Sequence, residues 1–174
     1  MPSRTPSDYT SDQTVSPERL VVDASFLVAI VDSSDSLHGR ARSLDASLEA
    51  SPHEVLYFDI LVAEAISALA RRSRERKRTH EFGPALDALL GRSEDNLLWI
   101  AQFLPNTFYE VIDLVRQSEG RLNFNDAFIA LVMREQGLRY LLSFDADFDT
   151  LPWLTRIGSV ESLEALRPSS DGRP

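Results

Sequence analysis

Residues 20–24 read LVVDA, an apolar run that ends in a carboxylate. A short, continuous apolar run is typical of a strand buried on both faces, as in a parallel sheet. Four later segments have a similar character: EVLYFD (54–59), NLLWIAQF (96–103), LRYLLSFD (138–145) and RIGSV (156–160). Because helical patterns alternate with these segments, we predict an α/β fold in three α/β/α layers. Its central, mostly parallel sheet would have four to five strands, with helices on both faces.

The helices between these strands are predicted from their apolar periodicity and from the residues that start and stop them. Pro105 is typical of a first helical turn, and Gly137 is typical of the position just past a helix end. The predicted helices span residues 25–32, 37–51, 60–77, 79–92, 105–120 and 124–137.

The length of 174 residues fits one compact domain. We expect it at residues 19–167, between mobile tails at 1–18 and 168–174 that are rich in Ser, Pro and Asp. The chain has no cysteine, which excludes disulfides, thiolate nucleophiles and cysteine-based zinc sites. It also lacks a secretory signal and any apolar run near the ~20 residues that a membrane span needs. We therefore expect a cytoplasmic protein that is not attached to a membrane.

The net charge is −9, although contacts to nucleic-acid phosphates need Lys and Arg. The basic residues are concentrated in residues 71–80, where six of them stand beside a single acid. We predict that this basic strip contacts phosphates. The alternative is a solvated helix end whose cations complement the helix dipole. The six residues are Arg71, Arg72, Arg74, Arg76, Lys77 and Arg78.

Two acids, Asp23 and Asp145, directly follow predicted strands. Functional groups gather at the carboxyl ends of the strands in open parallel sheets. A carboxylate buried there needs a cation, hydrogen-bond donors or water to offset the cost of its charge. Each acid alone also fits a helix N-cap, so it is their occurrence at two strand ends that points to a functional site.

Two further acids lie on predicted helices. Glu64 is surrounded by apolar residues, and a glutamate is almost never fully buried without a partner. Its structural alternative is a place at the edge of the buried stripe, reaching solvent or an arginine. Asp126 opens a helix, where it complements the dipole without any further function. The same position would also aim its carboxylate towards Asp23 and Asp145.

Four carboxylates in one place would repel one another strongly without cations. Hard oxygen ligands favour Mg²⁺ or Mn²⁺ over zinc, which favours nitrogen and sulfur. A carboxylate-bound Mg²⁺ centre supports phosphoryl transfer. We therefore predict a metal site made by Asp23, Glu64, Asp126 and Asp145.

The order of the segments VVDAS, AEAISAL, NFNDAFIA and LLSFDADF resembles the PIN-domain family, especially the VapC-type ribonucleases of toxin–antitoxin pairs. The resemblance spans residues 20–165, and the four acids are separated by 41, 62 and 19 residues. It implies a PIN-like fold in which the four acids are catalytic and bind Mg²⁺ or Mn²⁺. It also implies that a metal-activated water hydrolyses an RNA phosphodiester bond. The N-terminal tail is longer, and the charge more acidic, than is typical of these toxins.

Four other residues match positions around the acids. Ser25 matches a small hydroxyl residue that hydrogen-bonds within the site, and its alternative role is a helix N-cap. Asn125 matches a polar position beside the third acid. Asp147 and Asp149 follow the fourth acid, where one of them would assist through water, unless both are simply loop residues.

The resemblance also implies partners. These are an RNA substrate, contacted by the basic strip, and an antitoxin chain covering a groove between helices. A second copy of the chain, in a homodimer, is a further candidate partner. Five aromatic residues recur at core-like spacings, so we expect them to pack inside the protein and not to stack on bases: Phe103, Phe108, Tyr109, Phe124 and Phe128.

Other functions remain open. One is a PIN-like module that binds RNA or protein without cleavage, and another is a PIN nuclease that is not a toxin. An aspartyl-phosphate phosphatase would need an Asp where Ser25 stands. A receiver domain would need an acidic pair before its phosphorylated Asp and a lysine near the end, whereas the single lysine is Lys77.

Overall fold

The computed structural model describes residues 17–166, so the predicted mobile tails lie almost wholly outside the described residues. Their sheet has the strand order β3-β2-β1-β4-β5, and every pairing is parallel. The predicted α/β fold with a parallel sheet is therefore confirmed. The strands are β1 (Arg19–Val22), β2 (Glu54–Phe58), β3 (Leu97–Leu98), β4 (Tyr140–Leu142) and β5 (Thr155–Ile157).

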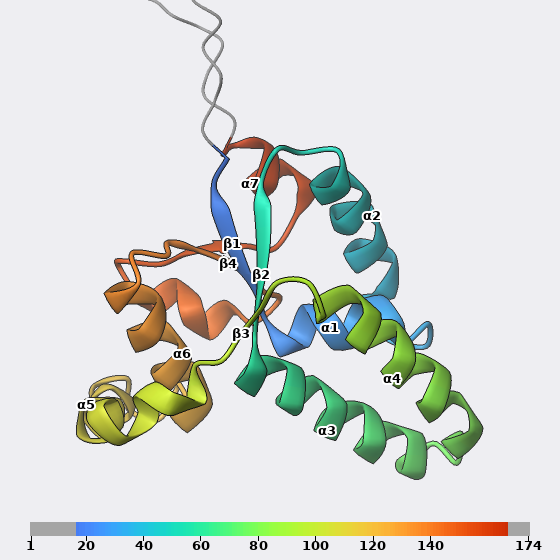
Figure 1. Ribbon diagram of the computed structural model, residues 1–174, viewed down its shortest axis with the longest axis horizontal. Helices are drawn as coiled ribbons and strands as arrows, with labels where there is room; N and C mark the ends of the chain where they lie inside the picture. Colours follow the sequence, from blue (N-terminus) through green and yellow to red (C-terminus); the bar gives the residue numbers. More distant parts are fainter. Residues whose placement is uncertain (1–16, 167–174) are drawn as a thin grey trace, which may run out of the picture.

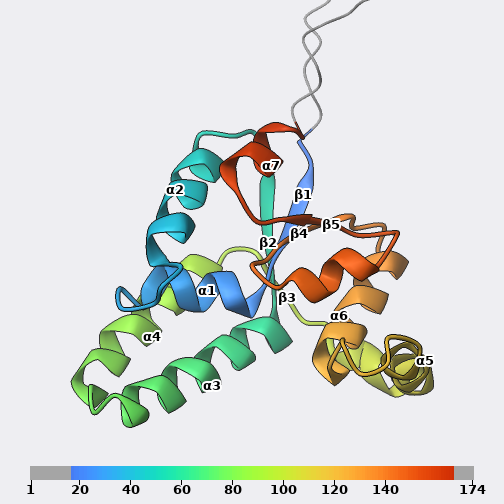
Figure 2. The same ribbon diagram turned by 180° about the vertical axis from the view of Figure 1, so that it is seen from behind.

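Helices cover the sheet on both sides. Figures 1 and 2, seen from opposite directions, place α1 to α4 on one side and α5 with α6 on the other. The helices are α1 (Ala24–Val31), α2 (His38–Glu49), α3 (Asp59–Glu75), α4 (Thr79–Ser93), α5 (Leu104–Gln117), α6 (Phe124–Glu135) and α7 (Val160–Glu164). Two short 3₁₀ helices, η1 (Ala101–Phe103) and η2 (Ala146–Thr150), complete the described chain. Within this range, no helix is both long and apolar enough to cross a bilayer.

The third predicted strand is much shorter than expected. Residues 96–103 were predicted to be extended, but only Leu97 and Leu98 pair with β2, at the edge of the sheet. The carboxylate of Asp59 accepts hydrogen bonds from the backbone N–H groups of Ile100 (2.8 Å) and Ala101 (3.4 Å). These groups are thereby drawn away from a strand ladder, and the chain turns into η1.

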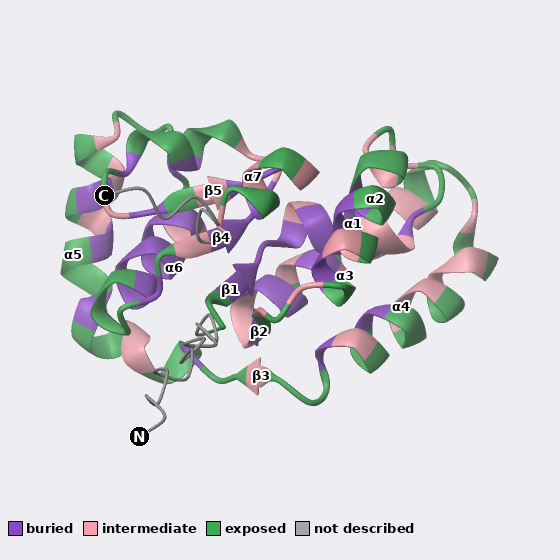
Figure 3. Ribbon diagram, turned by 90° about the horizontal axis from the view of Figure 1, so that it is seen from above, coloured by how far each residue is buried: buried purple, intermediate pink, exposed green. Residues whose placement is uncertain are grey.

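The core is centred on β1 and α6, which Figure 3 shows mostly in the colour of buried residues. Residues 126–133 of α6 are all buried, the pattern of a helix surrounded by protein rather than of an amphipathic surface helix. This central packing fixes the start of α6, and therefore Asp126, against the end of β1.

The carboxyl ends of the strands meet at one edge of the sheet, the lower edge in Figure 1, where α1 and α3 begin. Val22, the last residue of β1, lies opposite Leu142, the last residue of β4. Asp23 therefore follows β1 beside the point where Ser143 follows β4. The backbone N–H of Asp23 donates to the carbonyl of Leu142 at 3.0 Å, which joins the two strand ends directly.

Candidate active site

Asp23 is the most deeply placed acid of the site, with 6% of its surface exposed. It is the N-cap of α1, which is the alternative role considered for it from the sequence. Its Oδ2 accepts hydrogen bonds from the Ser25 hydroxyl, the Ser25 backbone N–H (3.2 Å) and the Ser143 hydroxyl (2.8 Å). The predicted contact between Ser25 and the first acid is thus present.

Burial raises the pKa of Asp23, and the hydrogen bonds from Ser25, Ser143 and the Ala24 backbone offset only part of this effect. The charged form is therefore costly without a nearby cation, even with its donors in place. No hydrogen bond from either hydroxyl ends on Oδ1. That oxygen retains its capacity to bind a positive ligand.

Ser143 is a site residue that the sequence reasoning did not single out. It is fully buried, and its hydroxyl accepts the backbone N–H of Asp145 at 3.0 Å while it donates to Asp23. The Ser25 hydroxyl in turn accepts the backbone N–H of Phe144 at 3.1 Å. Two hydroxyl groups thus link the end of β1 to the end of β4. The available signal was a serine two residues before Asp145, mirroring Ser25 two residues after Asp23.

Asp126 serves as a helix cap and as an acid of the site. Its Oδ2 accepts the backbone N–H of Asn123 at 2.9 Å, while the Asn123 side chain accepts the backbone N–H of Asp126 at 3.0 Å, forming a capping box. Burial is the largest of the effects that raise the pKa of Asp126 to about 6, and the Asn123 N–H opposes it. The negative charges of Asp23, Asp145 and Glu64 also contribute to this raised value.

Glu64 lies half-buried on α3 and is oriented by Asn125. The amide of Asn125 donates to Glu64 Oε2 at 3.4 Å, which gives the polar position beside the third acid a definite contact. The pKa of Glu64 is raised by burial and then by the charge of Asp23, while the Asn125 bond lowers it. Glu64 and Asp23, 41 residues apart in the chain, therefore act on each other electrostatically.

The acids that follow β4 have separate roles in the structure. Asp145 is the N-cap of η2, and its Oδ1 accepts the backbone N–H of Asp147 at 2.9 Å. Asp147 itself is exposed. Asp149 accepts a two-point contact from Arg156, at 2.8 and 2.7 Å, and the hydrogen bond from Arg156 lowers the pKa of Asp149. Of the two predicted assistants, Asp149 is thus already occupied by an arginine.

The charges of the other three predicted acids all raise the pKa of Asp126, so the four acids interact electrostatically. Within residues 17–166, no three acidic or histidine side chains are already arranged to hold a metal ion. The donor set still fits Mg²⁺ or Mn²⁺, since it consists of hard carboxylate oxygens. Burial, and then repulsion by the other acids, raise the pKa values of Glu64 and Asp126, and a divalent cation would offset this cost of ionisation.

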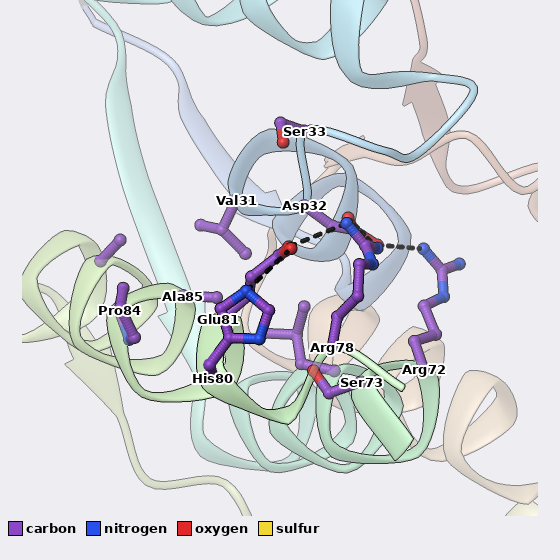
Figure 4. A pocket seen from close by; sticks show the side chains of 12 residues that line it. Val31, Asp32, Ser33, Arg72, Ser73, Arg78, His80, Glu81, Pro84 and Ala85 are labelled. Atoms are coloured by element: carbon purple, nitrogen blue, oxygen red, sulfur yellow. Dashed lines mark hydrogen bonds and ion pairs between the residues drawn. The ribbon is translucent and has the colours of Figure 1, made fainter. Parts of the chain in front are cut away.

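Half of the basic strip is paired with acids near the end of α3, and Figure 4 shows two of these cations, Arg72 and Arg78. Asp32 forms ion pairs with Arg76 (3.1 Å), Arg78 (3.4 Å) and Arg72 (3.6 Å). Arg72 also pairs with Asp35, and Arg78 with Glu81. Asp32, Arg72 and Arg78 border a cavity of about 370 Å³ between α1, α3 and α4.

The other three cations of the strip, Arg71, Arg74 and Lys77, are exposed and form no ion pair within the described residues. Two of the aromatic residues expected in the core also face outward. Phe108 is 43% exposed and Tyr109 is 82% exposed, so the packing prediction was wrong for both. Both lie on the solvent side of α5, whose buried positions are Thr107, Val111 and Leu114.

Comparison with known proteins agrees with the resemblance seen in the motifs. The structure is similar to that of VapC20 of Mycobacterium tuberculosis, a toxin that cleaves the sarcin-ricin loop. The two share 26% identity over 78% of this chain and 96% of that chain, with a TM-score of 0.60. No curated protein matches the sequence.

Two more distant structures share the fold. VapBC2 of Rickettsia felis, solved on a DNA fragment from its promoter, is 16% identical over 80% of this chain and 97% of that chain, with a TM-score of 0.58. PAE2754 of Pyrobaculum aerophilum is 20% identical over 85% and 93%, with a TM-score of 0.55. The family model of the PIN domain matches residues 20–154, which include all four acids. The chain therefore belongs to the PIN domain family.

Proposed function

We propose that the protein is an endoribonuclease that depends on Mg²⁺ or Mn²⁺ and hydrolyses RNA phosphodiester bonds. The observation that carries this proposal is that the charges of Asp23, Glu64 and Asp145 all raise the pKa of Asp126. The four acids come from four separate segments of the chain. A folded protein gains no stability from collecting four like charges, so such a cluster indicates a function. Membership of the PIN domain family supports nuclease activity.

Asp23, Glu64, Asp126 and Asp145 would hold the metal ion. When bound, such an ion lowers the pKa of water and offsets negative charge on the phosphate oxygens. The other residues of the chain position these ligands. Ser25 and Ser143 hold Asp23 through Oδ2, and Ser143 also fixes the backbone of Asp145. Asn125 orients Glu64.

We further propose that the protein is the toxin of a toxin–antitoxin pair. The 26% identity to VapC20, a toxin that cleaves an RNA loop, supports both the RNA substrate and the toxin role. The VapBC2 structure, which by name joins VapC to VapB, supports a cognate antitoxin. Arg71, Arg74 and Lys77 are the members of the basic strip with free charge for RNA phosphates, whereas Arg72, Arg76 and Arg78 are held by acids.

A homodimer is also proposed, through the exposed side of α5. Phe108 and Tyr109 stack edge-to-face on this helix, with ring centroids 5.6 Å apart. Exposed aromatic pairs of this kind are enriched at protein interfaces. Sedimentation of wild-type protein and of a Tyr109→Glu variant would test this, because a charge introduced at the interface should yield monomers.

The decisive experiment is RNA cleavage in Mg²⁺ or Mn²⁺ with Asp23→Asn and with Asp113→Asn as the matched control. Asp113 is an exposed acid on α5 that pairs only with Arg116 among the described residues. We expect Asp23→Asn to lose at least about a hundredfold in rate, the upper end for changes beside a metal site. The control should cleave like wild type. Cleavage that persists in EDTA would contradict the metal mechanism.

The alternatives give different results in the same experiment. RNA binding without cleavage in either metal would identify a binding module. Cleavage by a protein whose expression leaves bacterial growth unaffected would favour a PIN nuclease outside the toxin–antitoxin systems. A toxin should instead arrest growth, and Asp23→Asn should abolish the arrest.

A further inference from the structure

Arg156 on β5 binds two separate points of the segment that carries Asp145. Its Nε and Nη2 donate to the two carboxylate oxygens of Asp149 at 2.8 and 2.7 Å. Its Nη1 donates to the backbone carbonyl of Ser143 at 3.3 Å. The side chain is 19% exposed, so the guanidinium is largely enclosed by these contacts.

The two points lie on either side of Asp145. Ser143 precedes this acid by two residues, and Asp149 follows it by four. Ser143 also donates to Asp23 and accepts the backbone N–H of Asp145. A single planar guanidinium therefore links β5 to the turn that joins the first and fourth acids of the site. The forked geometry of arginine makes a contact of this kind directional.

The space for the guanidinium is provided by Gly158. A Cβ at this position would lie 2.5 Å from Arg156 Nη1 and 3.2 Å from the carbonyl oxygen of Ser143. Any side chain here would therefore press on the contact between Arg156 and Ser143. Because residue 158 has no side chain, Arg156 can reach the carbonyl oxygen of Ser143.

We propose that Arg156 is a positioning residue of the carboxylate site, which holds the segment from Ser143 to Asp149 so that Asp145 and Asp23 face the same divalent ion. The inference rests on the proposed metal-dependent function. The charge of Arg156 is balanced by the two-point contact to Asp149. The main contribution of Arg156 is therefore to hold the segment from Ser143 to Asp149 in place. The hydrogen bond to Asp149 is the largest cause that raises the pKa of Arg156; burial opposes it, and the charges of Asp149 and Asp145 add to it.

The test is the affinity for Mn²⁺, measured by calorimetry on full-length protein, together with the Mg²⁺ concentration that gives half-maximal cleavage. Arg156→Gln should weaken Mn²⁺ binding roughly tenfold to a hundredfold, as removal of groups that orient metal ligands does. Arg156→Lys keeps the charge but loses the fork, so its affinity should stay within about threefold of Arg156→Gln. Asp149→Asn should weaken binding in the same direction, because it removes the other half of the contact.

Two comparisons separate positioning from general damage. Arg139→Gln removes the same charge at the opposite end of β4, where the arginine is exposed, and should leave Mn²⁺ affinity unchanged. The double variant Arg156→Gln/Asp149→Asn should lose no more affinity than the weaker-binding single variant, because the two residues act through one contact.

Arg156→Gln that unfolds at a lower temperature yet binds Mn²⁺ within twofold of wild type would overturn the inference. So would full recovery of affinity in Arg156→Lys. Wild-type protein that binds Mn²⁺ without cleaving RNA would refute the proposed function alone, and the variant affinities would still decide the role of Arg156. Wild-type protein that binds no Mn²⁺ would overturn both.

Discussion

Replacing Asp126 by Asn should stabilise the metal-free protein while abolishing its activity. The pKa of Asp126 rises from 3.8 to about 6 on folding, a difference of roughly two units. At 1.36 kcal/mol per unit, ionising this carboxylate at neutral pH costs the folded state about 3 kcal/mol. Because the effective dielectric constant of protein sites exceeds that of a dry interior, we expect a smaller gain of about 2 kcal/mol in the free energy of unfolding.

The sign follows from proton binding. A raised pKa means that the folded state holds its proton more tightly than the unfolded chain, so the ionisation of Asp126 opposes folding. This penalty is nearly absent below the unfolded value of 3.8, grows as the pH rises towards about 6, and is constant above that. The advantage of the Asn variant should therefore shrink as the pH falls from 6 to 4. The capping box should survive, because the Asn side-chain oxygen can still accept the N–H of Asn123.

The assay is urea unfolding in EDTA at pH 7.5 and at pH 4, with Asp113→Asn as a control that should change the free energy of unfolding by less than about 0.5 kcal/mol. Added Mn²⁺ should stabilise wild type by about 2.7 kcal/mol at a hundredfold excess over its dissociation constant, and should leave the Asp126→Asn variant nearly unaffected. If this variant is no more stable than wild type in EDTA at pH 7.5, the proposed cost of ionising Asp126, which comes from burial and then from repulsion by the other acids, is refuted.

Three other substitutions test separate parts of the structure. Ser143→Ala removes a charge-assisted hydrogen bond to Asp23, worth about 1.5–3 kcal/mol, so the pKa of Asp23 should rise further and Mn²⁺ affinity should fall most steeply at acidic pH. Unchanged affinity across the pH range would contradict the role of this hydroxyl. Gly158→Ala should displace the guanidinium of Arg156. We expect it to lower the free energy of unfolding by about 1–3 kcal/mol and also to weaken Mn²⁺ binding. A variant that unfolds more easily but binds Mn²⁺ as wild type does would argue against a link between residue 158 and the metal site. Asp32→Asn should destabilise the protein by about 1–3 kcal/mol at pH 7. Burial raises the pKa of Asp32, but hydrogen bonds from Ser34 and the charges of Arg76 and Arg78 outweigh it and hold the pKa below 3.8. The deficit in urea unfolding should therefore disappear as the pH falls through that lowered value, and a deficit that persists there would exclude the ionised carboxylate as its cause.

The local pattern of the chain was sufficient to predict the α/β fold and the strands that lead into Asp23 and Asp145, whereas the end of β3 was predicted wrongly. An apolar run followed by an acid, as in LVVD, predicts a buried strand and places the acid at its carboxyl end, where ligands bind in open parallel sheets. Glu64 stood out for a similar reason, because a charged residue among apolar neighbours conflicts with burial. Periodicity and composition act over a few residues, and these features are all local.

Only the tertiary structure decided which residues far apart in the sequence form hydrogen bonds or ion pairs, or change one another's pKa. The pairing of Val22 with Leu142 brings Ser143 against Asp23, 120 residues away, and this depends on strand register rather than on any local pattern. In the same way, the packing of the α3–α4 hairpin against the end of α1 brings Asp32 to three arginines of the basic strip, which neutralises charges that looked free in the sequence. The raised pKa of Asp126 also has a tertiary origin, because burial and repulsion depend on neighbours supplied by other segments of the fold.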